Sequence, residues 1–225
     1  MYKRMHIEHH AWVNTDRDPE GNYQYGSLIG FVLLSAFFGA GFLFVVWWNA
    51  LLSIAGRCQF TKTAGQRREI AASTAGCVVV AGALVAMSIT WPVMLWLWIV
   101  PMLTTTFFWS SLILTPEHYG LYDTDAPSKT RSTRSNAVMR FITWNVGYHT
   151  AHHLVPKVAG RRLPAFQASL PDEFWPEQTS GYLAMQGRII SSLLPSIFGK
   201  HRIQSNVTIF MKTHPVVWKN RVWRI

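Results

Sequence analysis

Charged side chains are missing from two long stretches of this 225-residue chain. Residues 21–56 and residues 70–116 contain no Asp, Glu, Lys or Arg. A helix in a soluble protein normally keeps a charged face at helical period, and these stretches have none. About 20 apolar residues cross a bilayer, so the second stretch is long enough for two crossings. The sequence therefore predicts an all-α integral membrane protein, with a transmembrane hairpin over 70–114 that turns near Trp91 and Pro92.

Acidic residues are also few, since 11 Asp and Glu stand against 21 Lys and Arg. The basic residues gather in segments that flank the apolar ones: 57–69, 129–140 and the chain after His153. This placement is typical of cytoplasmic loops and of contacts with anionic headgroups. No zinc-finger or RNA-binding signature accompanies them, so we expect no nucleic-acid partner.

Cysteine is nearly absent as well. Cys58 lies in a basic segment and Cys77 in an apolar one, so we expect no disulfide. The polar, histidine-rich N-terminus does not have the pattern of a cleavable signal peptide. The sequence contains no flavin or haem motif and no HExxH motif of a zinc peptidase. Any redox chemistry would therefore draw its electrons from an external carrier.

Histidine, by contrast, occurs in two clusters of the same pattern, H-x-x-H-H. They are formed by His6, His9 and His10 and, in NVGYHTAHHLVP, by His149, His152 and His153. On a helix, positions i, i+3 and i+4 share one face, so three imidazoles project into one small volume. Neutral imidazole is a ligand for iron, zinc and copper. The clusters therefore predict one metal site, with rings of the two within about 10 Å of each other.

The arrangement resembles the membrane fatty acid desaturase superfamily. MHIEHHAWVNTDRDPE, which includes Asp18-Pro19-Glu20, resembles the second histidine box, and TRSTRSNAVMRFITWNVGYHTAHHLVPKV resembles the third box and its approach. PEHYG resembles the isolated histidine that follows the last span. The resemblance covers most of residues 1–170 and implies two irons at the cytoplasmic ends of a transmembrane bundle. The ligands that it implies are His6, His9, His10, His118, His149, His152 and His153.

The first box of that family, H-x-x-x-H or H-x-x-x-x-H, has no counterpart in this sequence. His201 and His214 fit no box. The chain thus resembles a desaturase without its N-terminal part, and a truncated gene model, a fragment and a degenerate paralogue all remain open. We treat residues 1–225 as one desaturase-like domain with five parts. These are 1–27 with the second box, the apolar segment 28–54, the hairpin 70–114, 115–170 with His118 and the third box, and a cytoplasmic tail 171–225.

Residues 28–54 need a special placement. A single metal site requires an even number of membrane crossings between the two clusters, and the hairpin already supplies two. Gly39-Ala40-Gly41 interrupts the apolar stretch and offers a bend. We therefore expect a re-entrant or interfacial segment, which leaves both clusters and the basic loop 57–69 on the cytoplasmic side.

The expected function is an O2-dependent desaturase of a fatty acyl chain, with two non-haem irons as cofactors. Its partners would be a membrane lipid or acyl substrate and an electron donor of ferredoxin, cytochrome b5 or rubredoxin type. A hydroxylase or ketolase of a lipid, alkane or carotenoid, and an inactive metal-binding membrane fragment, are the alternatives. Side chains expected to orient the imidazoles are Glu8, Asp16, Asp18, Glu117 and Asn145.

Overall fold

The computed structural model describes residues 1–15, 17–20, 25–121, 129–171 and 181–198, and the backbone of 217–218 and 221–222. The helices are α1 (Tyr2–Trp12), α2 (Leu28–Ile54), α3 (Ala64–Thr90), α4 (Val93–Phe107), the π-helix η1 (Phe108–Leu114), α5 (Thr115–His118), α6 (Ala137–Ile142), α7 (His149–Leu154), the 3-10 helix η2 (Gly160–Arg162), α8 (Leu163–Ala168), α9 (Tyr182–Leu193) and the 3-10 helix η4 (Leu194–Phe198). Two short antiparallel strands, β1 (Val217–Trp218) and β2 (Arg221–Val222), pair Val217 with Val222. The regular structure of the described residues is thus helical apart from β1 and β2, as the sequence predicts.

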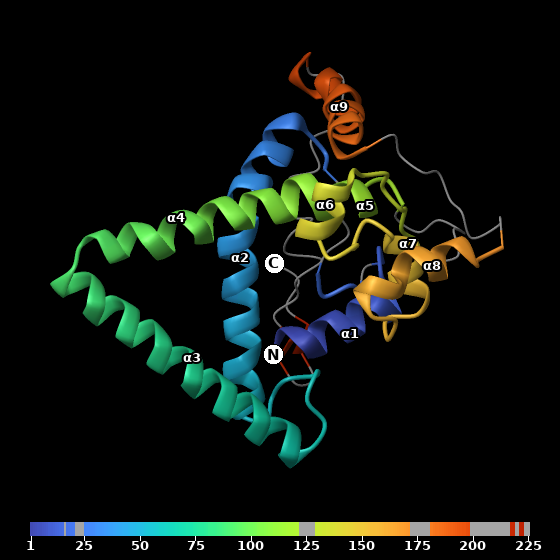
Figure 1. Ribbon diagram of the computed structural model, residues 1–225. Coiled ribbons are helices and arrows are strands. Elements are labelled where there is room, and N and C mark those ends of the chain that lie inside the picture. The colour runs from blue at the N-terminus through green and yellow to red at the C-terminus, as the bar shows by residue number, and fades with distance from the viewer. Residues whose placement is uncertain are drawn as a thin grey trace.

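Helices α3 and α4 form a hairpin that leads away from the rest of the molecule (Figure 1). Thr63 starts α3 with a capping box, in which its Oγ1 accepts a hydrogen bond from the backbone N–H of Gln66. The turn between the helices lies at Trp91 and Pro92, where the sequence predicts it. Within the described residues, α3 is the one helix long and apolar enough to cross a membrane by length and composition. Its side chains are largely exposed, which separates it from a buried core helix.

The interruption expected at Gly39-Ala40-Gly41 is not observed. The structure shows one uninterrupted helix, α2, of 27 residues, which is about 40 Å of helix. Glycine in a helix costs about 1 kcal/mol relative to alanine, but it keeps its N–H donor and does not force a break. In an apolar segment without proline, every interrupted backbone hydrogen bond costs more than that. The continuous helix is therefore lower in free energy than an interrupted one.

The start and the middle of α2 lie near the elements that carry the histidine clusters. At its start, the Tyr25 hydroxyl lies 3.1 Å from the Oγ1 of Thr115, the first residue of α5. Farther along, the Phe42 ring stacks edge-on against Tyr2 of α1, with centroids 5.7 Å apart. An ion pair of 2.7 Å between Arg4 and Glu69 joins α1 to the beginning of α3. Helix α2 thus runs along the histidine-bearing part of the molecule, and only the hairpin leaves it (Figure 1).

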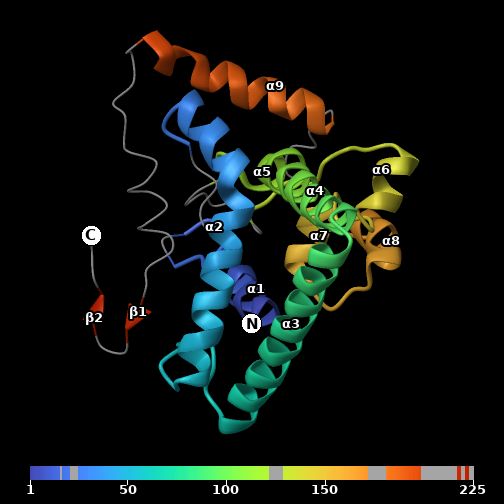
Figure 2. The same cartoon turned by 90° about the vertical axis from the view of Figure 1, so that its left-hand side faces the viewer.

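Helix α9 crosses the first turns of α2, as Figure 2 shows. Its apolar side chains recur at Met185, Ile189 and Leu193, which is one face of a helix. They pack with Phe31 of α2 into a buried core, against which Tyr25, Leu28 and Tyr119 also lie. This core holds the start of α2 beside α5 and thereby fixes the position of the histidine that α5 carries.

Candidate metal centre

Three helices bring seven histidines together. Helix α1 carries His6, His9 and His10, α5 carries His118, and α7 carries His149, His152 and His153. Across α1 and α7, the ring centroids of His10 and His153 are 4.1 Å apart, and those of His10 and His152 are 4.6 Å apart. The His118 centroid lies 5.0 Å from that of His9. All seven predicted ligand residues therefore belong to one cluster, well inside the separation expected from sequence.

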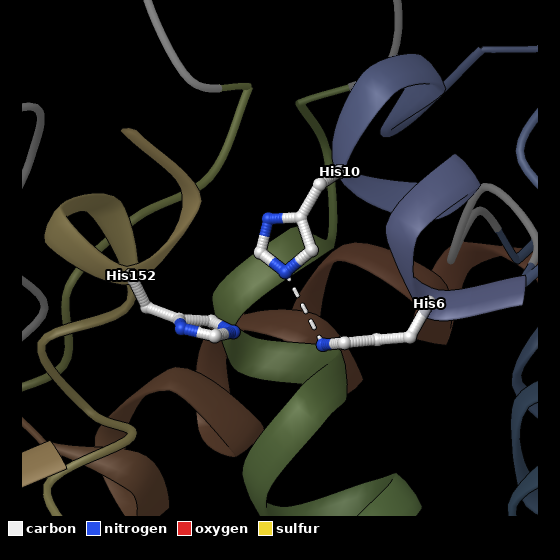
Figure 3. Close-up of side chains that lie close together, drawn as sticks. All are labelled: His6, His10 and His152. Carbon is white, nitrogen blue, oxygen red and sulfur yellow. Dashed lines mark hydrogen bonds between the residues drawn. The ribbon is translucent and has the colours of Figure 1, made fainter. Parts of the chain in front are cut away.

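The described residues contain three groups of possible ligand atoms, and the atoms of each group lie within 4.8 Å of one another. One is His6, His9 and Glu20, the other two contain histidines alone, and His149 belongs to none of the three. The first histidine group comprises His6, His10 and His152, whose ring nitrogens converge from α1 and α7 (Figure 3). The second comprises His9, His118 and His153. The second group is buried and the first is half-buried, so the two positions differ in access.

Distances between nitrogens fit shared metal ions. The Nε2 atoms of His6 and His10 lie 3.2 Å apart, and those of His118 and His149 lie 2.9 Å apart. Two nitrogens that bind one metal at about 2.1 Å stand about 3.0 Å apart at a right angle and about 3.4 Å apart at a tetrahedral angle. The side chain of His153 is 8% exposed, and neither of its ring nitrogens has a hydrogen-bond partner among the described residues. A buried imidazole of this kind fits a metal ligand, because a bound ion would satisfy it.

A carboxylate lies behind two histidines of α1 and one of α7. Glu20 Oε1 lies 2.7 Å from His6 Nδ1, and both oxygens of Asp18 lie within 2.9 Å of His9 Nδ1. Glu117 Oε2 faces His149 Nδ1 at 3.1 Å but without the geometry of a hydrogen bond. Glu20 and Asp18 hydrogen-bond to Nδ1, which holds the proton there and leaves the Nε2 lone pair of His6 and His9 directed into the cluster. These two carboxylates thus favour the tautomer that a metal ion requires.

Burial keeps most of the rings neutral. It lowers the pKa of His118, His149 and His153 well below the usual value, and the neighbouring imidazoles lower it further. The same causes lower the pKa of His10 to about 3 and that of His152 to about 4. These rings keep their lone pairs at neutral pH.

His9 has a raised pKa, although burial alone would lower it. The negative charges of Glu20 and Asp18 outweigh the burial. Burial raises the pKa of Asp18 despite the nearby His9, and it raises the pKa of Glu117 despite a hydrogen bond from Tyr182. The pair of His9 and Asp18 therefore shares a proton beside buried rings whose pKa values are lowered.

The metal-free protein is expected to lose stability as the pH falls from 7 to 5. The five rings with lowered pKa stay neutral when folded, whereas unfolded histidines take up protons below about pH 6.5. The five rings contribute fully to the free energy of unfolding above that pH, and this contribution is lost on acidification. His9, Asp18 and Glu117 have raised pKa values and act in the opposite direction, but they are fewer. Each net proton is worth about 1.4 kcal/mol per pH unit. Thermal unfolding of the metal-free chain in detergent measures the slope, and His152→Gln should reduce it; equal slopes would contradict the prediction.

Not all of the predicted orienting side chains contact the rings. Asp18 and Glu117 do. Glu8 makes no hydrogen bond or ion pair with a histidine in the described part of the chain, and Asn145 bonds the carbonyl oxygen of Gly160 instead. Asp16 lies outside the described residues, as do His201 and His214. Asn145 has a φ of 62°, so it shapes the turn before α7 rather than orienting an imidazole.

Three residues were missed by the sequence interpretation. Glu20 contacts His6, and its signal was present in Asp18-Pro19-Glu20. Asn14 donates its side-chain amide to the carbonyl oxygens of His118 and Lys129, and so joins the end of α1 to α5. The hydroxyl of Tyr182 donates to Glu117 Oε1 at 2.9 Å from the start of α9. The latter two contacts join segments far apart in sequence, which no local pattern reveals.

Comparison with known proteins gives one match. A model of the protein family described as fatty acid desaturase matches residues 1–184, which covers α1 to the start of α9. The match contains all seven clustered histidines and the three carboxylates behind them. No curated protein and no solved structure matches the chain.

Proposed function

This chain belongs to the fatty acid desaturase family, and we propose on that premise that it is an O2-dependent fatty acyl desaturase whose clustered histidines hold two irons. The observation that supports the proposal is that two groups of three histidines lie side by side, with the rings of His10 and His153 only 4.1 Å apart. Two groups at such a short separation suit a pair of metal ions acting on one substrate. Imidazole ligands suit iron among the transition metals.

The irons, when bound, supply activation of O2 and the oxidising power to break an unactivated C–H bond. The protein supplies the geometry. Glu20 and Asp18 hold protons at the Nδ1 atoms of His6 and His9 and thereby fix these ring orientations, and Glu117 lies 3.1 Å from Nδ1 of His149. Desaturation removes two hydrogens from the acyl chain and, with two electrons and two protons, converts O2 to two waters. The electrons come from an external donor of ferredoxin, cytochrome b5 or rubredoxin type.

The membrane placement follows from the triangle of α2, α3 and α4 (Figure 1). We place α3 and the run from α4 through η1 as two crossings, and α2 in the interface beside the histidine-bearing helices. The parity of crossings is then even although α2 is continuous. The ion pair from Arg4 to Glu69 puts the basic loop 57–69 on the side of the cluster. That side is the cytoplasmic one under the positive-inside rule.

Cysteine labelling tests this placement. Ile29 and Ala55 stand at the two ends of α2, and both are exposed. In a variant with Cys58 and Cys77 changed to serine, Ile29→Cys and Ala55→Cys are expected to react with a membrane-impermeant maleimide from the same side. Trp91→Cys, at the exposed hairpin turn, should react from the opposite side. Labelling of Ile29→Cys and Ala55→Cys from opposite sides would contradict an interfacial α2.

Lipid mass spectrometry tests the reaction itself. The native gene, with any in-frame codons that precede Met1, is expressed in a host and compared with His149→Ala. A product two mass units lighter than an acyl chain of the host, absent in the variant, is the expected result. A gain of sixteen mass units would indicate a hydroxylase instead. Bound iron without either product would indicate a metal-binding protein without turnover.

A further inference from the structure

A polar pocket of about 430 Å³ lies beside α7, outside the histidine cluster. Its walls come from the segment before α6, from α6 itself, from the residues that lead into α7, and from α8. These elements lie together on one side of the molecule (Figure 1). The volume is within the range of small-molecule sites, and none of the residues that line it is a histidine.

The lining is rich in hydrogen-bond donors and has no carboxylate. Arg134 and Arg140 supply two positive charges, and neither Asp nor Glu contributes to the wall. Arg140 is half-buried and donates to the carbonyl oxygen of Ser135, which fixes its guanidinium at the rim. The remaining N–H groups of a guanidinium form a rigid fork suited to an oxyanion. The charge of the lining therefore favours an anionic ligand.

Two buried side chains of the wall keep unused polar atoms. Gln167 is 1% exposed and Thr133 is 5% exposed. Neither Gln167 Nε2 nor Thr133 Oγ1 has a hydrogen-bond partner among the described residues. The orientation of the Gln167 amide is fixed, because its Oε1 accepts from Ser132 Oγ at 2.9 Å and from the backbone N–H of Ala151 at 3.3 Å. The group left over is thus a donor.

We propose that this pocket binds a phosphate-class oxyanion, held by Arg134, Arg140 and the side-chain amide of Gln167. The ligand would be either the phosphate of a lipid headgroup or a soluble phosphate. Phe141 and Trp144, at the end of α6, are 82% and 83% exposed. Exposed aromatic side chains beside a phosphate site suit the membrane interface, which favours the lipid headgroup as the source.

The pocket is connected to the histidine cluster of α7. Ser132 Oγ accepts from the backbone N–H of Thr150, and Gln167 Oε1 accepts from that of Ala151. Both N–H groups belong to the first turn of α7, directly after His149. A ligand that orders Gln167 therefore also steadies the helix that carries three of the imidazoles. The binding itself does not depend on iron or on the proposed reaction.

Binding is measured on the full chain in neutral detergent, with and without iron, by titration with inorganic phosphate and separately with dihexanoyl-phosphatidylglycerol. Arg140→Gln is expected to weaken binding about tenfold to a hundredfold, as for loss of a hydrogen bond to a charged group. Gln167→Glu should weaken it similarly, because it places a carboxylate beside the anion and keeps the acceptor for Ala151. Arg161→Gln, an exposed arginine outside the pocket, is the matched control and should change binding less than about twofold.

The outcomes distinguish a lipid headgroup from a soluble phosphate, and they distinguish failure of this proposal from failure of the desaturase proposal. Phosphate binding alone, dependent on Arg140, identifies a soluble ligand, and binding of the phospholipid alone identifies a headgroup. No saturable binding of either probe would overturn the proposal, as would equal losses for Arg140→Gln and Arg161→Gln. If Arg140→Gln fails to fold, two other variants test the proposal. Arg140→Lys keeps the charge and should retain most of the affinity, whereas Gln167→Glu should lose it. Persistence of binding in iron-free protein keeps this result independent of the desaturase proposal.

Discussion

Replacing His153 with alanine is expected to lower the iron content of the anaerobically loaded chain from about two ions to about one. His153 belongs to the buried group with His9 and His118, and a two-histidine remnant binds iron weakly. His152→Ala should remove the other ion, because His152 belongs to the group with His6 and His10. The double variant should lose both ions. Iron is measured per chain after gel filtration, by elemental analysis.

The matched control for this series is His201→Ala, a histidine that fits neither cluster. It is expected to keep about two irons. If His201→Ala lowers the iron content as much as His153→Ala does, the ligand set derived from the cluster is wrong. If His152→Ala and His153→Ala each remove all of the iron, the two groups do not bind independently, and the division into two positions is wrong.

Local patterns in the sequence were sufficient to predict the histidine-bearing helices. H-x-x-H-H on a helix puts three rings on one face, and the structure has both patterns in helices α1 and α7. The long uncharged stretch likewise predicted two helices with a turn at Trp91 and Pro92. In each case the feature depends on residues within one or two turns, so neighbouring residues in sequence were sufficient to predict it.

Local patterns could not predict contacts between distant segments or the balance of competing backbone energies. The glycines at 39 and 41 suggested an interruption, but the helix continues through them because an apolar segment keeps its backbone hydrogen bonds. Helix α9 lies in the part interpreted as a cytoplasmic tail, and its apolar period is visible at 185, 189 and 193. What the sequence could not show is that this face packs on α2 and that Tyr182 reaches Glu117.

Asp18 offers the sharpest test of how the protein controls its imidazoles. Its side chain is fully buried and accepts from His9 Nδ1 and from the backbone N–H groups of Asn14 and Glu20. Asp18→Asn is nearly isosteric, but its NH2 group must then face one of these donors. The clash is relieved if His9 places its proton on Nε2, where it blocks the metal. The variant is therefore expected to bind iron about 10- to 100-fold more weakly at the buried position.

A competition titration with an Fe(II) chelator measures this change, and the half-buried position in the same chain provides an internal reference. Glu8→Gln is the matched control, since it also removes one negative charge from the neighbourhood of α1 but contacts no histidine in the described chain. It should alter the iron affinity by less than about threefold, as expected for a partly exposed charge. The loss in Asp18→Asn should also persist at high salt, because it comes from the tautomer of a buried ring and not from a screened charge. Equal affinities in Asp18→Asn and Glu8→Gln would show that the carboxylate behind His9 does not set the proton position, and the role assigned to Glu20 would fail with it.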